Sequence, residues 1–63
     1  MIEVTKMNGS KITVNADLIE LVEETPDTLI TLTSGKKYIV QESRREVREL
    51  VISYKRQIFT MEK

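Results

Sequence analysis

The chain has 63 residues, with ten basic and ten acidic side chains and neither histidine nor cysteine. A chain of this size buries only about 60% of its unfolded surface, and it lacks the ligands and nucleophiles of disulfides, usual zinc sites, thiol enzymes and histidine bases. Its balanced charge also lacks the strong positive field of a typical nucleic-acid binder, so composition predicts a non-enzymatic protein with no metal site and no cofactor.

The N-terminal region carries no targeting pattern that we recognise. The first twenty residues contain Glu3 and Asp17 and no apolar core of roughly 7–15 residues, so no secretory signal is expected. No apolar run approaches the roughly 18 residues that suggest a membrane span. With no cysteine in the chain, we expect a reducing, cytoplasmic location and no membrane span.

The first predicted element is a β-hairpin. Ile2 and Val4 alternate with polar residues over about residues 2–6, which is the period of a half-buried strand. The dipeptide Asn-Gly at positions 8 and 9 accepts the positive φ angles of a type I′ turn. The alternation at Ile12 and Val14 therefore predicts the returning strand, over about residues 11–15.

The next segment, residues 18–24, is either a third strand over about 19–24 or a single helical turn leading into one, and we favour the strand. Acidic side chains gather here at Glu20, Glu23, Glu24 and Asp27. The cluster lacks the glycine-bearing spacing of a calcium loop and instead indicates a charged edge strand. The tetrapeptide ETPD that closes this segment is typical of a turn.

Two further strands follow, joined by a Ser-Gly turn. β-Branched residues over about 28–33 predict the fourth strand, and the apolar alternation over about 37–41 predicts the fifth. Leu29 and Ile39 are out of phase with their apolar neighbours, which leaves apolar groups on both faces of the sheet. This pattern suggests a homo-oligomer.

The hydrophobic period then changes to that of a helix. Ser43 and Glu46 have the spacing of a capping box, in which each side chain accepts a hydrogen bond from the other's backbone N–H. The inner stripe predicted for a helix over about 44–59 consists of Val47, Leu50, Val51, Tyr54 and Ile58. The last few residues should fray. The predicted fold is therefore α+β, a small antiparallel β-meander of four to five strands followed by one C-terminal helix packed on one face, in a single domain over 1–63.

A second face of this helix is a candidate contact surface. Ile52 and Phe59, seven residues apart, lie beside Arg48 and Lys55, although scattered surface hydrophobicity would give the same pattern. Two arginines also occupy the first helical turn, where the helix dipole prefers negative charge. The candidate partner-binding residues are Arg44, Arg45, Arg48, Ile52, Lys55, Arg56 and Phe59.

Several segments together resemble the bacterial flagellar FlbD family, called SwrD where it is tied to swarming. The resemblance spans Ile2 to Ile58, and its most specific segments are IELVEETPDTLITL and GKKYIVQES. It implies a small cytoplasmic protein, located at the flagellar base, that supports swimming or swarming motility. It further implies motor or stator components as partners, and it does not imply an enzymatic activity.

Two functions follow from these observations. The first is an interaction module whose outer helix face binds a flagellar component or a second copy of the chain. The second is a nucleic-acid-binding regulatory module, because the order of strands, a GKKY hairpin and a helix also resembles the LytTR type of DNA-binding domain. In that case Lys36, Lys37, Arg44 and Arg45 would contact phosphates, but the balanced charge counts against it.

Overall fold

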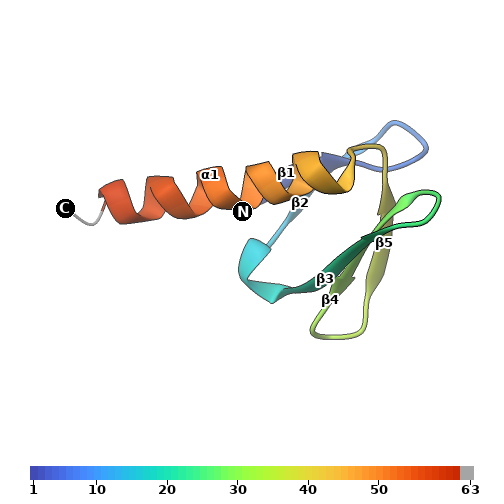
Figure 1. Ribbon diagram of the computed structural model, residues 1–63, viewed down its shortest axis with the longest axis horizontal. Coiled ribbons are helices and arrows are strands. Elements are labelled where there is room, and N and C mark those ends of the chain that lie inside the picture. The colour runs from blue at the N-terminus through green and yellow to red at the C-terminus, as the bar shows by residue number, and fades with distance from the viewer. Residues whose placement is uncertain (62–63) are drawn as a thin grey trace.

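The computed structural model describes residues 1–61, with side chains described as far as Ile58, and its fold is α+β as predicted. Its elements in chain order are β1 (Ile2–Thr5), β2 (Lys11–Val14), a 3₁₀ turn (Ala16–Leu18), β3 (Ile19–Glu24), β4 (Thr28–Leu32), β5 (Lys37–Val40) and α1 (Arg44–Met61). Every strand boundary lies within one residue of the position expected from the sequence. The helix lies over the strands and its C-terminal part extends beyond them (Figure 1).

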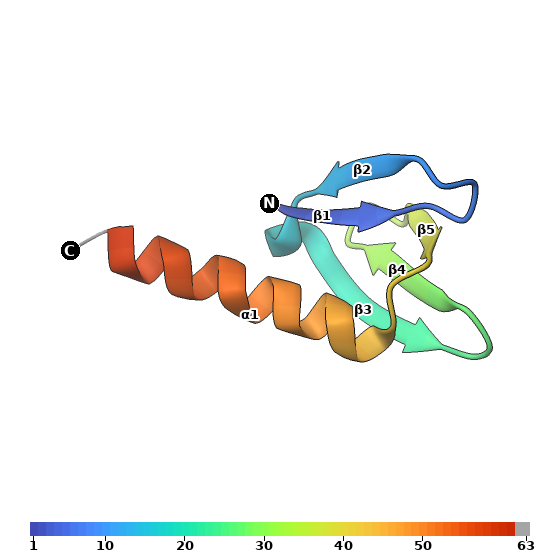
Figure 2. The ribbon, with the colours of Figure 1, turned by 90° about the horizontal axis from the view of Figure 1, so that it is seen from above.

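The strands form two antiparallel sheets, so the predicted meander is divided into a β1-β2 hairpin and a β3-β4-β5 sheet. The division occurs at the 3₁₀ turn, where the side-chain oxygen of Asn15 accepts a hydrogen bond from the N–H of Asp17 at 3.0 Å. β3 starts directly after this turn, at Ile19. The favoured prediction of a strand over 19–24 is therefore confirmed, and a short helical turn that ends at Leu18 leads into it. Figure 2 shows the hairpin and the three-stranded sheet as separate ribbons above the helix.

The turn at Asn8-Gly9 differs from the predicted type I′. Gly9 has a φ of +93°, but no residue other than glycine has a positive φ in the described part of the chain, so Asn8 does not adopt the type I′ conformation. The N–H of Gly9 donates to the carbonyl of Lys6 at 2.9 Å, and the N–H of Lys6 donates to the carbonyl of Ser10 at 2.8 Å. These bonds define a three-residue loop with a glycine bulge, the next most common hairpin connection.

The junction between the two sheets consists of the last residues of β1 and the segment after β5. Lys6 forms an isolated antiparallel bridge with Val40, and the N–H of Gln41 donates to the carbonyl of Thr5 at 2.7 Å. The two carboxylate oxygens of Glu42 accept hydrogen bonds from the N–H and the hydroxyl of Thr5, each at 2.8 Å. Residues within the predicted GKKYIVQES segment thus hold the hairpin against the start of the helix.

The core draws on both sheets and on the helix. Four side chains are less than 2% exposed: Val4 from β1, Ile30 from β4, Val40 from β5 and Val47 from α1. Their β-branched shapes suit a pleated surface, and the alternation along β4 turns every second residue inward. One contiguous apolar cluster therefore joins all three parts.

The helix begins with the predicted capping box. The N–H of Ser43 donates to the Glu46 carboxylate at 2.9 Å, and the N–H of Glu46 donates to the Ser43 hydroxyl at 3.1 Å. The helix continues to Met61, two residues beyond the predicted end. No helix among residues 1–61 combines the length and hydropathy that crossing a bilayer requires.

The inner stripe of the helix is narrower than predicted. Val47 is buried and Val51, Tyr54 and Ile58 are half-buried, but Leu50 is 36% exposed. Leu50 lies about 60° around the helix from Val47, on the flank where it borders an open hollow instead of the core. The apolar face that closes the fold therefore excludes Leu50.

Candidate interaction groove

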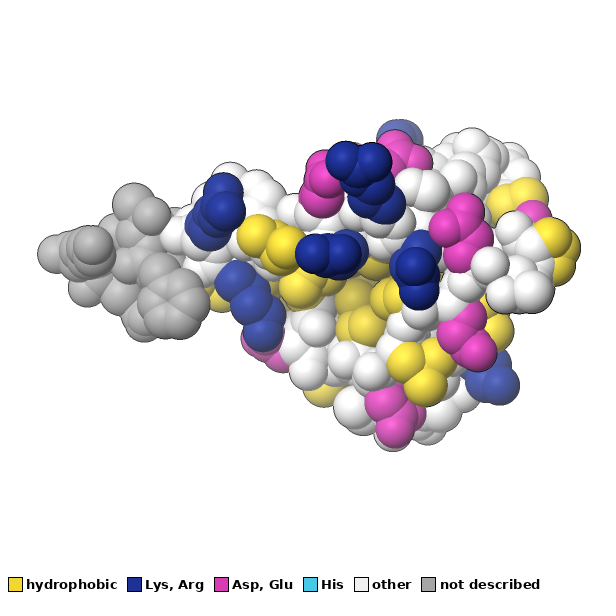
Figure 3. Space-filling view, in the orientation of Figure 1, with side chains coloured by type: hydrophobic (Ala, Val, Ile, Leu, Met, Phe, Trp, Pro, Cys, Tyr) yellow, Lys and Arg dark blue, Asp and Glu magenta, His cyan; other side chains and the backbone are white. Residues whose placement is uncertain are grey.

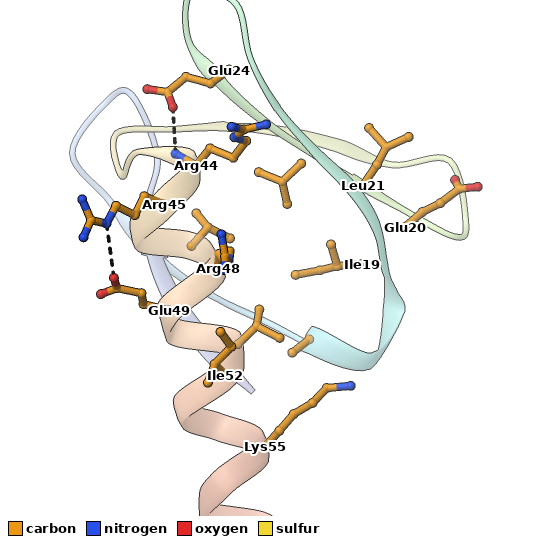
Figure 4. Close-up of a pocket in the computed structure, with 14 residues that line it drawn as sticks. Ile19, Glu20, Leu21, Glu24, Arg44, Arg45, Arg48, Glu49, Ile52 and Lys55 are labelled. Carbon is orange, nitrogen blue, oxygen red and sulfur yellow. Dashed lines mark hydrogen bonds and ion pairs between the residues drawn. The ribbon is translucent and has the colours of Figure 1, made fainter.

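An open groove runs between α1 and the edge strand β3 (Figure 4). Its volume is about 1150 Å³. In Figure 4 Ile19 points from β3 toward the helix, while Arg44 and Lys55 extend from the helix toward the strand. The groove is therefore bounded by one strand and one helix that are distant in sequence.

The floor of the groove is apolar. Val22 of β3 and Val47 and Val51 of α1 line it, and each belongs to the core or packs against it. Ile52 lies on the helical side and is 41% exposed, whereas Val47 is buried and Val22 and Val51 are half-buried. An exposed isoleucine beside an apolar floor offers a partner a surface it can bury.

Cationic side chains follow the helical side of the groove. Arg44, Arg48 and Lys55 all line it and are exposed. Their spacing of four and seven residues places them on one flank of the helix. Figure 3 shows Lys and Arg side chains in a row along the helix, beside a strip of hydrophobic side chains. The groove thus combines an apolar floor with basic side chains along its helical side.

The strand side contributes carboxylates, and one of them caps the helix. The carboxylate of Glu24 accepts a hydrogen bond from the N–H of Arg44 at 3.1 Å, across the end of the groove (Figure 4). A carboxylate here satisfies a free N–H of the first helical turn and complements the helix dipole. Glu24 therefore supplies the negative charge that Arg44 and Arg45 do not.

The structure brings five of the seven predicted residues to this groove: Arg44, Arg45, Arg48, Ile52 and Lys55. Arg45 also forms an exposed ion pair with Glu49, at 3.4 Å, on the side of the helix away from β3 (Figure 4). Arg56 is exposed on α1 but does not line the groove. The side chain of Phe59 lies outside the described residues.

The strand wall of the groove was not among the predicted site residues. Ile19, Glu20 and Leu21 line it together with Val22 and Glu24. The acidic cluster indicated an edge strand, and β3 is indeed at the edge of its sheet. No group of three or more potential metal ligands occurs among the described residues. The edge position was the available signal that this strand borders a binding surface.

The two basic pairs of the nucleic-acid hypothesis are not brought together. Lys36 precedes β5 and Lys37 is its first residue, whereas Arg44 and Arg45 begin the helix after β5 ends. Three further strand residues, about 10 Å of β5, lie between Lys37 and the end of the strand, so the two pairs are at opposite ends of β5.

The opposite flank of the helix is acidic. A shallower hollow of about 500 Å³ is lined by Glu3, Glu42, Glu46, Glu49, Leu50 and Ser53. Glu46 lines only this hollow, whereas Glu49 lines both hollows and pairs with Arg45, so the two signs of charge are only partly separated around α1.

Comparison with known proteins identifies the family. Residues 1–59 match the FlbD family, described as flagellar and swarming motility proteins. The chain belongs to the FlbD family. No curated protein and no solved structure matches it. The FlbD match covers both sheets and most of α1, including all described residues of the groove, and it gives the chain a role related to flagellar motility.

Proposed function

We propose that this FlbD-family chain supports the power of the flagellar motor by binding a motor or stator component through the groove between α1 and β3. In this proposal the protein acts in the cytoplasm at the flagellar base and catalyses no reaction. The observation that carries the proposal is a groove with an apolar floor and a basic helical side, in a protein of a motility family.

The composition of the groove supports a binding role. Interfaces that bind tightly combine buried apolar anchors with arginine, and their centre is sealed from water by surrounding contacts. Here Ile52 is the exposed apolar candidate, and Arg48 and Lys55 flank it on the same side of the helix. The absence of histidine and cysteine from the chain is consistent with a binding role in place of catalysis.

The proposal is tested by placing a charge on the groove in motile cells. Ile52→Glu, introduced at the chromosomal locus, should reduce swarm expansion and the rotation speed of tethered cells toward the values of a deletion strain. The substitution inserts a carboxylate among Arg48, Lys55 and the apolar floor, and any partner would have to desolvate it. The measured quantities are swarm radius and rotation speed under load.

Gln57→Glu is the matched control, because it adds one negative charge to an exposed position of α1 that lines neither hollow. It should leave motility unchanged. Immunoblots and circular dichroism establish that both variants accumulate and fold. Wild-type swarming by a folded Ile52→Glu strain would contradict the proposed function.

A further inference from the structure

The edge of the three-stranded sheet is open where it meets the groove. The strand order is β3-β4-β5, so among the described residues β3 has a pairing partner on one side only. The free side carries backbone N–H and C=O groups that can pair with another chain. β3 has six residues and is about 20 Å long, long enough to pair with a segment of similar length.

The hydrogen bonds of the neighbouring strand show which groups of β3 face outward. Leu32 donates to Lys36 and accepts from Gly35, so its backbone groups are directed toward β5. Alternation along β4 then directs Thr31 and Leu29 toward β3, where their partners are Leu21 and Glu23. The intervening residues Val22 and Glu24 therefore direct their N–H and C=O groups to the open edge.

These outward groups lie beside three basic side chains of the helix, Arg44, Arg48 and Lys55, which we call the basic row. In Figure 2 β3 is the strand of its sheet nearest to α1, and Figure 4 shows Arg44, Arg48 and Lys55 on the helical side of the same groove. Arg44 and Arg48 are about 6 Å apart along the helix axis. Alternate side chains of an extended segment are about 6.6 Å apart, so successive same-face residues match this spacing.

We propose that the groove accepts an extended acidic segment of a partner protein as a fourth strand, paired with the open edge of β3 and neutralised by Arg44, Arg48 and Lys55. The proposal rests on the proposed function, since it names the kind of segment that the motility partner would present. It belongs to the class of recognition in which backbone pairing supplies affinity and alternate side chains supply specificity.

The chemistry of the segment follows from the two faces of the sheet. Side chains of the added strand that share the face of Val22 meet the helix, where the rim is cationic, and should be aspartate or glutamate. Side chains on the other face would flank Leu21 of β3, which is 43% exposed, and should be apolar. The segment therefore alternates acidic and apolar residues.

The probe is the peptide acetyl-TEVEVEVT-amide, titrated into the ¹⁵N-labelled full chain. Strand addition should slow hydrogen exchange of the Val22 and Glu24 amides at least tenfold at saturation, while Leu21 and Glu23, already paired with β4, change little. In antiparallel pairing, residues of the added strand on the Val22 face direct their N–H groups to β3, so N-methylation of the peptide's glutamates removes these groups and should abolish binding. N-methylation of its valines, whose N–H groups face away, should leave binding nearly unchanged.

A charge exchange tests the basic row. Arg48→Glu combined with Lys55→Glu should weaken binding of the acidic peptide at least tenfold and should permit binding of acetyl-TKVKVKVT-amide. Lys36→Glu combined with Lys37→Glu makes the same change of charge at the β4–β5 turn, away from the groove, and should leave the acidic peptide's affinity within twofold of the original.

The proposal is overturned if the acidic peptide does not bind at about 1 mM, if it binds without protecting Val22, or if duplex DNA binds the basic row more tightly than the peptide. These results are separable from the motility assay. Peptide binding with normal swarming of Ile52→Glu cells would contradict the proposed function and leave the strand-binding groove standing. A swarming defect of Ile52→Glu cells without peptide binding would contradict the strand-binding groove and leave the proposed function standing.

Discussion

At the scale of single residues, Glu42 connects the hairpin to the start of the helix. Burial raises the pKa of its carboxyl, but hydrogen bonds from the backbone and hydroxyl of Thr5, together with the N–H of Glu42 itself and the charge of Lys11, outweigh burial and hold the pKa below its usual value. The ionised form is therefore favoured by folding. Its contribution to stability is complete above the unfolded pKa of about 4.3 and is lost as the pH falls through the lower folded pKa.

Glu42→Gln should consequently remove an acid-dependent part of the stability. The amide keeps the size of the side chain but loses the charge, so the variant should be less stable at pH 7 by roughly 1 kcal/mol. The difference should shrink as the pH falls through the lowered folded pKa, because the wild-type carboxyl then takes up a proton as well. Urea unfolding at pH 7 and pH 3 measures it, with the exposed Glu3→Gln as control. If the loss of unfolding free energy in Glu42→Gln were the same at both pH values, the lowered pKa of Glu42 would be contradicted.

Sequence reasoning identifies the residue contacts that are local and misses those that are not. The capping box of Ser43 and Glu46 was predictable because both partners lie within one helical turn. The Glu42–Thr5 and Glu24–Arg44 contacts join residues that are 37 and 20 positions apart. Such pairs exist only after the sheets have been placed, so no local pattern predicts them.

At the scale of elements, the two hairpin turns that contain glycine, β1–β2 and β4–β5, have the same geometry. The N–H of Gly35 donates to the carbonyl of Leu32, as that of Gly9 does to Lys6, and each glycine has a φ of +93°. The sequence located both turns correctly but gave the wrong type at Asn8-Gly9. Type I′ turns and glycine-bulge loops both use glycine at a positive φ, and they differ in a loop length that the alternation of short strands leaves open.

The equivalence of the two turns predicts equal costs of substitution. Gly9→Ala and Gly35→Ala should each destabilise the fold by about 1 kcal/mol, because an L side chain disfavours positive φ. No neighbouring atom lies within 4 Å of an added Cβ at either site, so the cost is conformational and not steric. Asparagine at the same positions should cost less. Chemical denaturation measures all four variants, and unequal alanine costs would contradict the shared geometry.

The arrangement of the elements also explains why the helical wall of the candidate groove was predictable from the sequence and the strand wall was not. The helical wall follows from periodicity, which places Arg44, Arg48, Ile52 and Lys55 on one flank. The strand wall depends on which edge of the sheet lies beside the helix. That arrangement is set by the 3₁₀ turn at Ala16–Leu18, which divides the strands into two sheets and orients β3 alongside α1.

At the scale of the whole molecule, we propose that both sheets and the helix form one domain. The buried cluster takes Ile2, Val4 and Val14 from the hairpin, Ile30 from the sheet and Val47 from the helix. In so short a chain no part retains a core when another is removed. The sequence indicated one domain from the absence of linkers, and the shared cluster gives that expectation a physical basis.

A single cooperative transition is therefore expected, and the chain contains its own probes. Of its two tyrosines, Tyr38 lies on β5 and Tyr54 on α1, and both are half-buried. Tyr38→Phe and Tyr54→Phe each leave one tyrosine whose fluorescence reports one element. Val4→Ala, in the hairpin that neither tyrosine occupies, should destabilise the fold by roughly 2 kcal/mol. Its urea midpoint should fall equally for both probes, because unfolding is all-or-none. A shift reported by one tyrosine alone would show that the parts unfold separately and that the core does not couple them.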